Sequence, residues 1–129
     1  MEKQAGLWID HRKTVIVLIS EAGELIKEIT SGLEKRVNFT GGTASEDGST
    51  EDVRDRQFEG HLNKYYDQVI ALLRQSDSIL IFGPGEAKRE LQKRLESKGM
   101  KARIRGIESA DKLTEAQVAA KVRGYFRSL

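Results

Sequence analysis

One short segment restricts the possible folds of this chain more than any other. An apolar run, Ile79-Leu80-Ile81-Phe82, leads into a Gly83-Pro84-Gly85 turn, and helix-forming residues follow from Glu86. A continuous apolar run bounded by turn residues is typical of a strand that is covered on both faces. Glycine allows the sharp bend that such a turn needs, and in open α/β sheets ligands usually bind at this end of a strand. The segment therefore predicts an α/β fold and indicates where to search for a site.

Four further strands and three helices are predicted from the spacing of apolar residues. The strands are expected at residues 6–9, 14–19, 25–30 and 101–107, and the helices at residues 56–75, 86–97 and after Thr114. Alternation and β-branched residues support the strands, and apolar residues three or four apart support the helices. The order β-β-β-α-β-α-β-α predicts a five-stranded mixed sheet, in which an antiparallel meander is followed by parallel strands with right-handed crossovers. The third strand is the most polar of the meander, so we expect it to be the most exposed.

Side-chain patterns also predict how the helices begin, end and pack. The first helix has apolar residues spaced for one buried face: Phe58, Leu62, Tyr65, Val69, Leu72 and Leu73. On the second helix Glu90 and Arg94 are spaced to form an ion pair, and Gly99 marks the end of that helix. Thr114 and Gln117 have the spacing of a capping box, which predicts the start of the last helix.

Length and composition limit the classes of function. The 129 residues predict one domain, residues 1–129, large enough to bury a hydrophobic core. The absence of cysteine from the sequence excludes disulfides, thiolate metal ligands and cysteine nucleophiles. The N-terminal residues lack the pattern of a signal peptide, and no apolar run is long enough to span a bilayer. A cytoplasmic protein without membrane contact is therefore expected.

Charge is unevenly distributed, although the formal net charge is only +2. Residues 86–129 contain 12 Lys and Arg against 6 Asp and Glu, so this part of the chain is basic. A basic surface suits contact with a phosphate backbone, but amphipathic helices also carry Lys and Arg on solvated faces. Charge alone leaves both interpretations open.

A long stretch before the first helix lacks periodicity. Residues 41–52 consist mainly of Gly, Ser, Thr and acidic residues. Such a segment buries too little apolar surface to offset the entropy lost on ordering. A mobile loop is therefore expected at about residues 38–55. A loop of this length is either functional or a tolerated insertion.

Two stretches carry a resemblance to a known fold family. Residues 35–42 combine the basic pair Lys35 and Arg36 with the pair Gly41 and Gly42, and the Gly83-Pro84-Gly85 turn is followed by Lys88. In these features the chain resembles the central domain of Pelota and of the archaeo-eukaryotic class-one release factors. The resemblance implies a three-layer, ribonuclease H-like α/β domain with a role connected with translation.

A closer resemblance covers nearly the whole chain. The sequences LWIDHR at residues 7–12, GPGEAK at 83–88 and VAAKVRGYF at 118–126 are similar to those of small bacterial proteins labelled translational machinery proteins. One departure bears on activity: release factors place a glutamine after the Gly-Gly pair, where this chain has Thr43. The residues that follow Thr43 are acidic and should repel an RNA backbone, so peptide release is not expected.

Asp10 and His11 are the weak candidates for catalysis. In ribonuclease H-like nucleases an aspartate of the first strand holds a divalent metal, which suggests metal-dependent phosphodiester hydrolysis as an alternative function. Two-metal hydrolysis needs several converging carboxylates, and neither Glu86 nor Asp111 is convincingly placed. The competing interpretation is that Asp10 begins a turn by accepting hydrogen bonds from backbone amides. No metal site and no cofactor is predicted.

The candidates for binding phosphate are backbone turns and basic side chains. Amides at the turn around Gly83 and Gly85, with Lys88 beside them, could cradle an anion, although a structural corner is favoured. Arg103 and Arg105 are predicted on one face of a strand, where they could bind phosphate or pair with nearby acids.

Together these patterns predict a non-catalytic module, related to the central domains of release and ribosome-rescue factors, that binds RNA or a ribosome-associated partner. The predicted partners are tRNA, rRNA or the ribosome. The predicted contacts are Lys35, Arg36, Gly41, Gly42, Gly83, Gly85, Lys88, Arg103 and Arg105. Two alternatives stay open: a metal-dependent phosphodiester hydrolase and a homo-oligomeric protein-interaction module.

Overall fold

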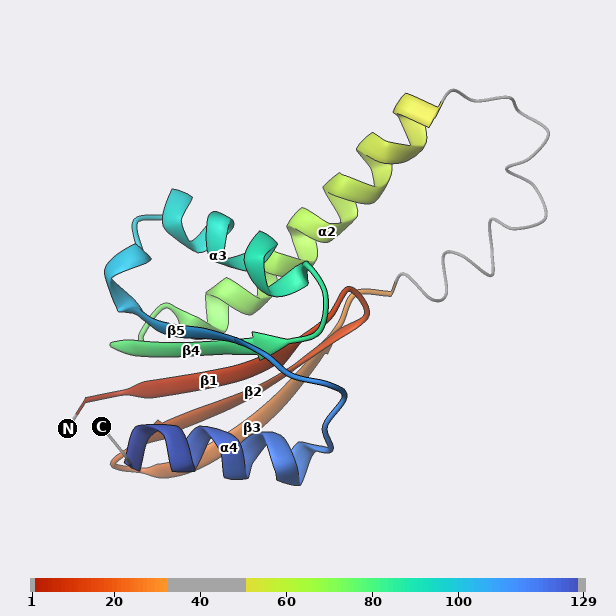
Figure 1. The fold of residues 1–129 in the computed structure, drawn as a ribbon. Helices are drawn as coiled ribbons and strands as arrows, with labels where there is room; N and C mark the ends of the chain where they lie inside the picture. Colours follow the sequence, from red (N-terminus) through yellow and green to blue (C-terminus); the bar gives the residue numbers. More distant parts are fainter. Residues whose placement is uncertain (1, 33–50, 128–129) are drawn as a thin grey trace.

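The computed structural model describes residues 2–32 and 51–127, with side chains described for residues 2–32 and 60–127. Eight helices and strands follow the predicted order (Figure 1). They are β1 (Gln4–Ile9), β2 (Lys13–Ser20), β3 (Gly23–Thr30), α2 (Glu51–Leu73), β4 (Ser78–Gly83), α3 (Ala87–Ser97), β5 (Ile104–Ser109) and α4 (Glu115–Arg127). A short 3-10 helix, η2 (Lys101–Arg103), precedes β5.

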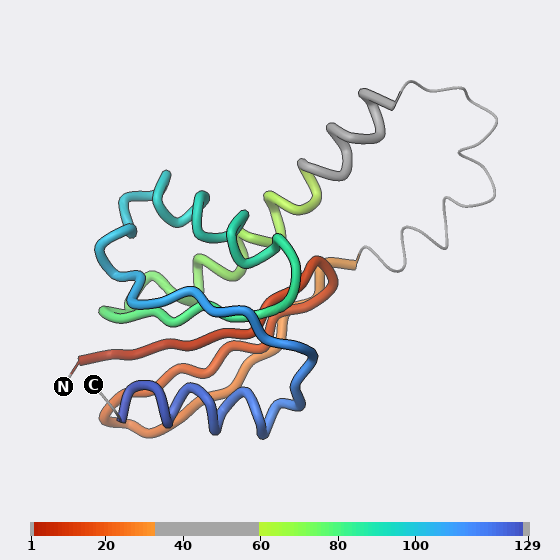
Figure 2. Tube along the Cα trace, viewed as in Figure 1, coloured from red at the N-terminus to blue at the C-terminus, as the bar shows by residue number. Residues whose placement is uncertain are grey.

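The strands form one five-stranded sheet in the order β3-β2-β1-β4-β5. β1 pairs antiparallel with β2 and parallel with β4, while β2–β3 is antiparallel and β4–β5 is parallel. The predicted mixed sheet is therefore confirmed. Helices α2 and α3 cover one face and α4 covers the other, which gives three layers (Figures 1 and 2).

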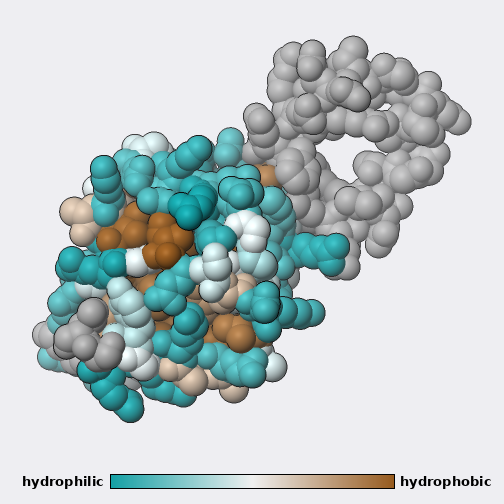
Figure 3. Space-filling view, viewed as in Figure 1, coloured by the Kyte–Doolittle hydropathy of each residue, from teal (hydrophilic) through white to brown (hydrophobic). Residues whose placement is uncertain are grey.

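The core consists of two clusters, one on each face of the sheet. Because side chains alternate along a strand, Leu7 and Ile9 of β1 join the cluster under α2 and α3, while Trp8 joins the cluster under α4. All three are at most 1% exposed. Each such buried side chain stabilises the fold by roughly 1.5–3 kcal/mol. Hydrophilic residues cover most of the face viewed in Figure 3.

The third strand is the most exposed part of the meander, as predicted. β3 lies at an edge of the sheet, and its side chains are mostly exposed. Leu25 is 52% exposed and Ile26 is 38% exposed. Lys27 and Glu28 follow them directly, and charges of this kind on an edge strand discourage pairing with another chain.

The predicted helix signals are confirmed at two ends. At the start of α4, the Thr114 hydroxyl accepts a 3.1 Å hydrogen bond from the Gln117 amide, and Gln117 Oε1 accepts one of 2.9 Å from the Thr114 amide. At the end of α3, Gly99 adopts a φ of 80°. The Met100 amide then donates to the Leu95 carbonyl, which satisfies a carbonyl left over at the helix end.

The strand predicted at residues 101–107 is wrong in its first half. Lys101–Arg103 form the 3-10 turn η2, and β5 begins only at Ile104. The chain leaves α3 at Gly99 and has to reverse before it can enter the sheet, and the Arg103 amide donates to the Met100 carbonyl in that turn. Arg103 and Arg105 therefore do not share a strand face, because only Arg105 lies on the strand.

The predicted ion pair between Glu90 and Arg94 is also wrong. Arg94 instead binds Asp67 of α2 through two hydrogen bonds, of 2.7 and 2.9 Å. This hydrogen bonding lowers the pKa of the Asp67 carboxyl. A two-pronged guanidinium–carboxylate contact is stronger than an exposed pair along one helix, and only the packing of α2 beside α3 makes it available.

Part of the predicted loop at residues 38–55 is helical. α2 already begins at Glu51, so residues 51–55 belong to its first turns. Residues 38–50 lie outside the described residues. Within the described part of the chain, no helix has the length and apolar character needed to cross a membrane.

Candidate functional site

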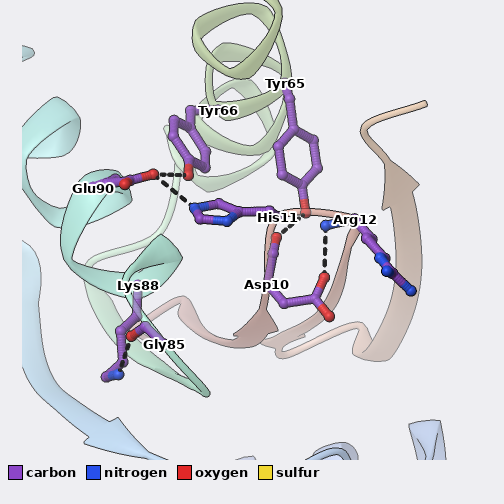
Figure 4. A network of polar contacts seen from close by, with 8 residues as sticks. All are labelled: Asp10, His11, Arg12, Tyr65, Tyr66, Gly85, Lys88 and Glu90. Atoms are coloured by element: carbon purple, nitrogen blue, oxygen red, sulfur yellow. Dashed lines mark hydrogen bonds and ion pairs between the residues drawn. The ribbon is translucent and has the colours of Figure 1, made fainter. Parts of the chain in front are cut away.

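Asp10 directly follows the central strand β1 and organises the turn that joins it to β2. Its Oδ1 accepts a hydrogen bond from the Arg12 amide at 2.7 Å (Figure 4) and another from the Lys13 amide at 2.8 Å. The Asp10 amide donates to the Lys13 carbonyl at 3.0 Å. These bonds correspond to the turn-forming role that was weighed against catalysis.

Tyr65 of α2 fixes the same turn from above the sheet. Its hydroxyl donates to the Asp10 carbonyl at 3.0 Å and lies 2.6 Å from the Thr14 hydroxyl. Because the carbonyl can only accept, the single proton of Tyr65 goes to Asp10, and Thr14 must donate to Tyr65. Burial raises the pKa of Tyr65, which keeps this donor protonated.

His11 is held by two helices. Its Nε2 lies 3.0 Å from Glu90 Oε1 of α3, and Tyr66 of α2 donates a 2.6 Å hydrogen bond to the same oxygen (Figure 4). Burial, followed by the hydrogen bond and the charge of Glu90, raises the pKa of Tyr66. The second candidate for catalysis is thus part of a contact that joins the β1–β2 turn to α2 and α3.

The turn after β4 is a tight corner. A Cβ atom on Gly83, whose φ is 154°, would lie 2.2 Å from the Ile9 carbonyl oxygen, so only glycine fits there. Gly85 has a φ of 62°, and a Cβ atom added there would have no other atom within 4 Å. Lys88 is buried, and its ammonium donates to the Gly85 carbonyl at 2.5 Å. This bond closes the corner with the side chain that was proposed as a phosphate ligand.

The two predicted arginines lie at the other end of β4. The Arg103 guanidinium donates to the Arg74 carbonyl at 2.5 Å, and Arg105 donates to the Ser78 hydroxyl at 3.1 Å. Ser78 begins β4, whereas Gly83 ends it. The structure therefore does not bring Arg103 and Arg105 together with Gly83, Gly85 and Lys88.

The remaining predicted contacts, Lys35, Arg36, Gly41 and Gly42, lie outside the described residues. Among the residues that the structure does describe, no group of three or more His, Cys, Asp or Glu is arranged to hold a metal ion. The second histidine, His61 of α2, contacts the Ser31 carbonyl just beyond β3.

A cleft of about 640 Å³ opens at the end of β1, close to the corner after β4. Among the described residues, its charged lining residues are Asp10, Arg12, Lys13 and Lys112, and Trp8 and Pro84 also line it. Clefts of roughly 300–1,000 Å³ are typical of small-molecule sites. This is the end of the strands at which open α/β sheets usually bind ligands.

Sequence reasoning found the location of this cleft but missed its cations. Arg12 and Lys13 follow Asp10 directly, and their place at the end of a central strand was a usable signal. Lys112 belongs to the connection between β5 and α4, and nothing in the local sequence marks it. It reaches the cleft because β5 runs parallel to β4 and ends at the same edge.

The layers and strand order define a ribonuclease H-like α/β domain, the fold class expected from the sequence. The fold is similar to that of the Thermoplasma acidophilum Pelota protein, with a TM-score of 0.60 and 18% identity over 99% of this chain and 32% of that chain. For Archaeoglobus fulgidus Pelota the TM-score is 0.53, with 14% identity over 98% of this chain and 34% of that chain.

An archaeal translation termination factor, aRF1, also matches, with a TM-score of 0.49 and 14% identity over 98% of this chain and 39% of that chain. The likeness in fold rests on the two Pelota structures. The chain spans about a third of the length of those proteins. Neither a protein-family model nor a curated protein matches the sequence.

Proposed function

We propose that this chain is a non-catalytic module connected with translation, which binds RNA or a ribosome-associated partner. The observation that carries the proposal is the likeness in fold to Pelota over 99% of this chain. The similarity of residues 83–88 and 118–126 to translational machinery proteins supports the same role. The partners we propose are tRNA, rRNA or the ribosome.

The bonds made by Asp10 and His11 support a non-catalytic role. Asp10 Oδ1 is engaged by two amides, and His11 is engaged by the Glu90 carboxylate. Hydrolysis with two metal ions needs several carboxylates around the ions. The alternative of a metal-dependent phosphodiester hydrolase would have to supply them from residues beyond the described part of the chain.

Binding of a fluorescently labelled tRNA tests the proposal directly. Anisotropy titrations at about 50 and 200 mM salt should show an affinity that falls steeply with salt, because each neutralised phosphate releases counterions. Co-sedimentation with purified ribosomes tests the second kind of partner. Absence of both tRNA binding at low salt and ribosome binding would overturn the proposal.

The Arg103→Ala/Arg105→Ala variant tests the two arginines as RNA contacts. Both guanidinium groups make intramolecular hydrogen bonds, so the variant has to be compared with wild type by thermal unfolding before its affinity is interpreted. A folded variant with weakened tRNA binding would support the role. Unchanged binding would assign these side chains to stability alone.

A homo-oligomeric interaction module is the second candidate. The observation that favours it is the exposure of Leu25 and Ile26 on the edge strand β3, whose side chains could pack against a second copy although Lys27 and Glu28 discourage strand pairing. Sedimentation at rising protein concentration tests it, and a constant monomer mass would reject it. The expected cytoplasmic location stays a prediction.

A further inference from the structure

The cleft at the end of β1 is built from segments that are held in place by hydrogen bonds. On one side, Asp10 and Tyr65 hold the turn that carries Arg12 and Lys13, as described above. On the other side, hydrogen bonds at two successive residues, Ala110 and Asp111, tie the connection that carries Lys112 to the sheet. The Ala110 amide donates to the Gly83 carbonyl at 3.1 Å, and Trp8 Nε1 donates to the Asp111 carbonyl at 2.9 Å. Both cationic segments are therefore presented by a preformed frame, which lowers the entropy cost of binding.

The charges that line the cleft favour an anion. Among the described residues that line the cleft, three are cationic, Arg12, Lys13 and Lys112, and one is anionic, Asp10. That carboxylate already accepts two amide hydrogen bonds, which offset part of its charge. Within residues 2–32 and 60–127, neither the Lys13 nor the Lys112 ammonium has a hydrogen bond or an ion pair. Their charges are therefore available to a ligand.

The size of the cleft points to more than an isolated oxyanion. A water molecule occupies roughly 30 Å³ in the liquid, and the cleft, at about 640 Å³, is many times larger. Pro84 gives it apolar wall surface beside the cations, and Trp8 borders it although it is only 1% exposed. A nucleotide unit, with a charged phosphate and a less polar sugar and base, matches this combination of surfaces.

We propose that the cleft binds a nucleotide unit of RNA, with its phosphate between Lys13, Lys112 and Arg12. This inference rests on the proposed RNA-binding function and gives it a site. The same phosphate chemistry could come from a free nucleotide, so the experiment includes both sources.

A substitution at Asp10 tests whether the cleft prefers an anion or a cation. Asp10→Asn keeps an Oδ1 acceptor for the amides of Arg12 and Lys13 but removes the negative charge from the cleft wall. An anion site should then bind its ligand more tightly. A site for a divalent metal ion would respond in the opposite way, because it would lose a ligand. One variant thus separates this proposal from the hydrolase alternative.

The lysines are tested by a matched pair of variants. Lys13→Ala/Lys112→Ala removes two charges at the cleft, and Lys93→Ala/Lys101→Ala removes two exposed charges on α3 and η2. Both variants change the net charge equally, so a general electrostatic effect would act on both. Trp8 lines the cleft and is the only tryptophan in the chain, so its fluorescence reports events at this site.

Each protein is titrated with labelled tRNA, followed by anisotropy, and with adenosine monophosphate, followed by Trp8 fluorescence. We expect the cleft variant to lose at least about fivefold in affinity for tRNA, the control variant less than about twofold, and Asp10→Asn to gain affinity. Equal losses in the two lysine variants, or weaker binding by Asp10→Asn, would overturn the proposed site while RNA binding itself remained.

The titration with adenosine monophosphate distinguishes failure of the proposed site from failure of the proposed RNA-binding function. If wild type binds adenosine monophosphate with a change in Trp8 fluorescence but binds neither tRNA nor ribosomes, the phosphate site stands with a free nucleotide as its ligand, and the proposed function falls. If wild type binds neither tRNA nor adenosine monophosphate at low salt, the proposed site is overturned.

Discussion

Tyr66 donates a 2.6 Å hydrogen bond to Glu90 Oε1, the carboxylate oxygen that also contacts His11. Three separate segments of the chain therefore meet at one atom: the β1–β2 turn, α2 and α3. The contact sits beside the Asp10 turn and stabilises the frame from which the cleft is built (Figure 4). The contribution of the Tyr66 hydrogen bond to stability can be measured separately, because removal of the Tyr66 hydroxyl leaves the His11 contact with Glu90 in place.

Tyr66→Phe should lower the free energy of unfolding by about 1 kcal/mol, since a part-buried hydrogen bond to a carboxylate is lost while His11 still contacts Glu90. Urea unfolding measures the change. Tyr125→Phe is the matched control, because the Tyr125 hydroxyl makes a longer, exposed bond of 3.2 Å to the Arg105 carbonyl. An equal or larger loss in the control would contradict the importance of the Glu90 contact.

Stability should fall at alkaline pH because of Tyr65 and Tyr66. Their pKa values are raised in the folded protein, by burial first in both cases. Below the ordinary tyrosine pKa of about 10 both states keep the protons and the contribution is fully present. Above it the unfolded chain loses protons that the folded protein retains, so unfolding becomes easier as pH rises. Urea unfolding between pH 8 and about 11 should show this decline, and it should be smaller in Tyr65→Phe/Tyr66→Phe.

The contact between Asp67 and Arg94 should matter at neutral pH and disappear in acid. The Arg94 hydrogen bonds lower the pKa of Asp67, so its contribution is present above the ordinary aspartate pKa and is lost as pH falls through the lowered value. The Asp67 side chain is 43% exposed, so solvent screening limits the loss in Asp67→Asn to about 0.5–1 kcal/mol at pH 7. The urea midpoints of wild type and variant should converge as pH falls below the lowered pKa, and a difference that did not shrink with falling pH would rule out a charge effect.

Gly83→Ala and Gly85→Ala should differ strongly although only Pro84 lies between the two positions. A Cβ on Gly83 would meet the Ile9 carbonyl oxygen at 2.2 Å, and the central strand cannot move away without breaking the sheet. We expect a loss of about 3 kcal/mol or more. Gly85 has open space around its Cβ position, so only its φ of 62° costs energy, about 1–2 kcal/mol. Thermal unfolding would measure both, and equal losses would contradict the close approach at Gly83.

Local sequence patterns predicted the elements of this fold well, because periodicity and caps depend on neighbouring residues. The capping box at Thr114 and the turn at Gly99 are of this kind. The same patterns misplaced Arg103, since a short alternation of apolar and charged residues fits a 3-10 turn as well as a strand. They also misassigned Arg94, whose partner Asp67 lies on another helix.

The candidate site also combines features that the local sequence revealed with features that only the fold brings together. Asp10 and the Gly83 corner were recognised from their place after apolar runs, but their detailed contacts favour a structural role. Arg12 and Lys13 could have been found by attention to the end of the central strand. Lys112 could not, because only the parallel pairing of β4 and β5 carries it to that edge.

The pairing of β1 with both β2 and β4 constrains how the chain folds during synthesis. β2 follows β1 after a tight turn, so the meander can form as soon as its residues leave the ribosome. The other edge of β1 pairs with β4, which begins only at Ser78. Until then β1 presents an unpaired apolar edge, and the sheet cannot close before the long-range pairing is made. In the order of synthesis the β1–β4 pair therefore forms after the meander, and interruption of the chain before Gly83 would leave β1 with an exposed edge that invites pairing with other chains.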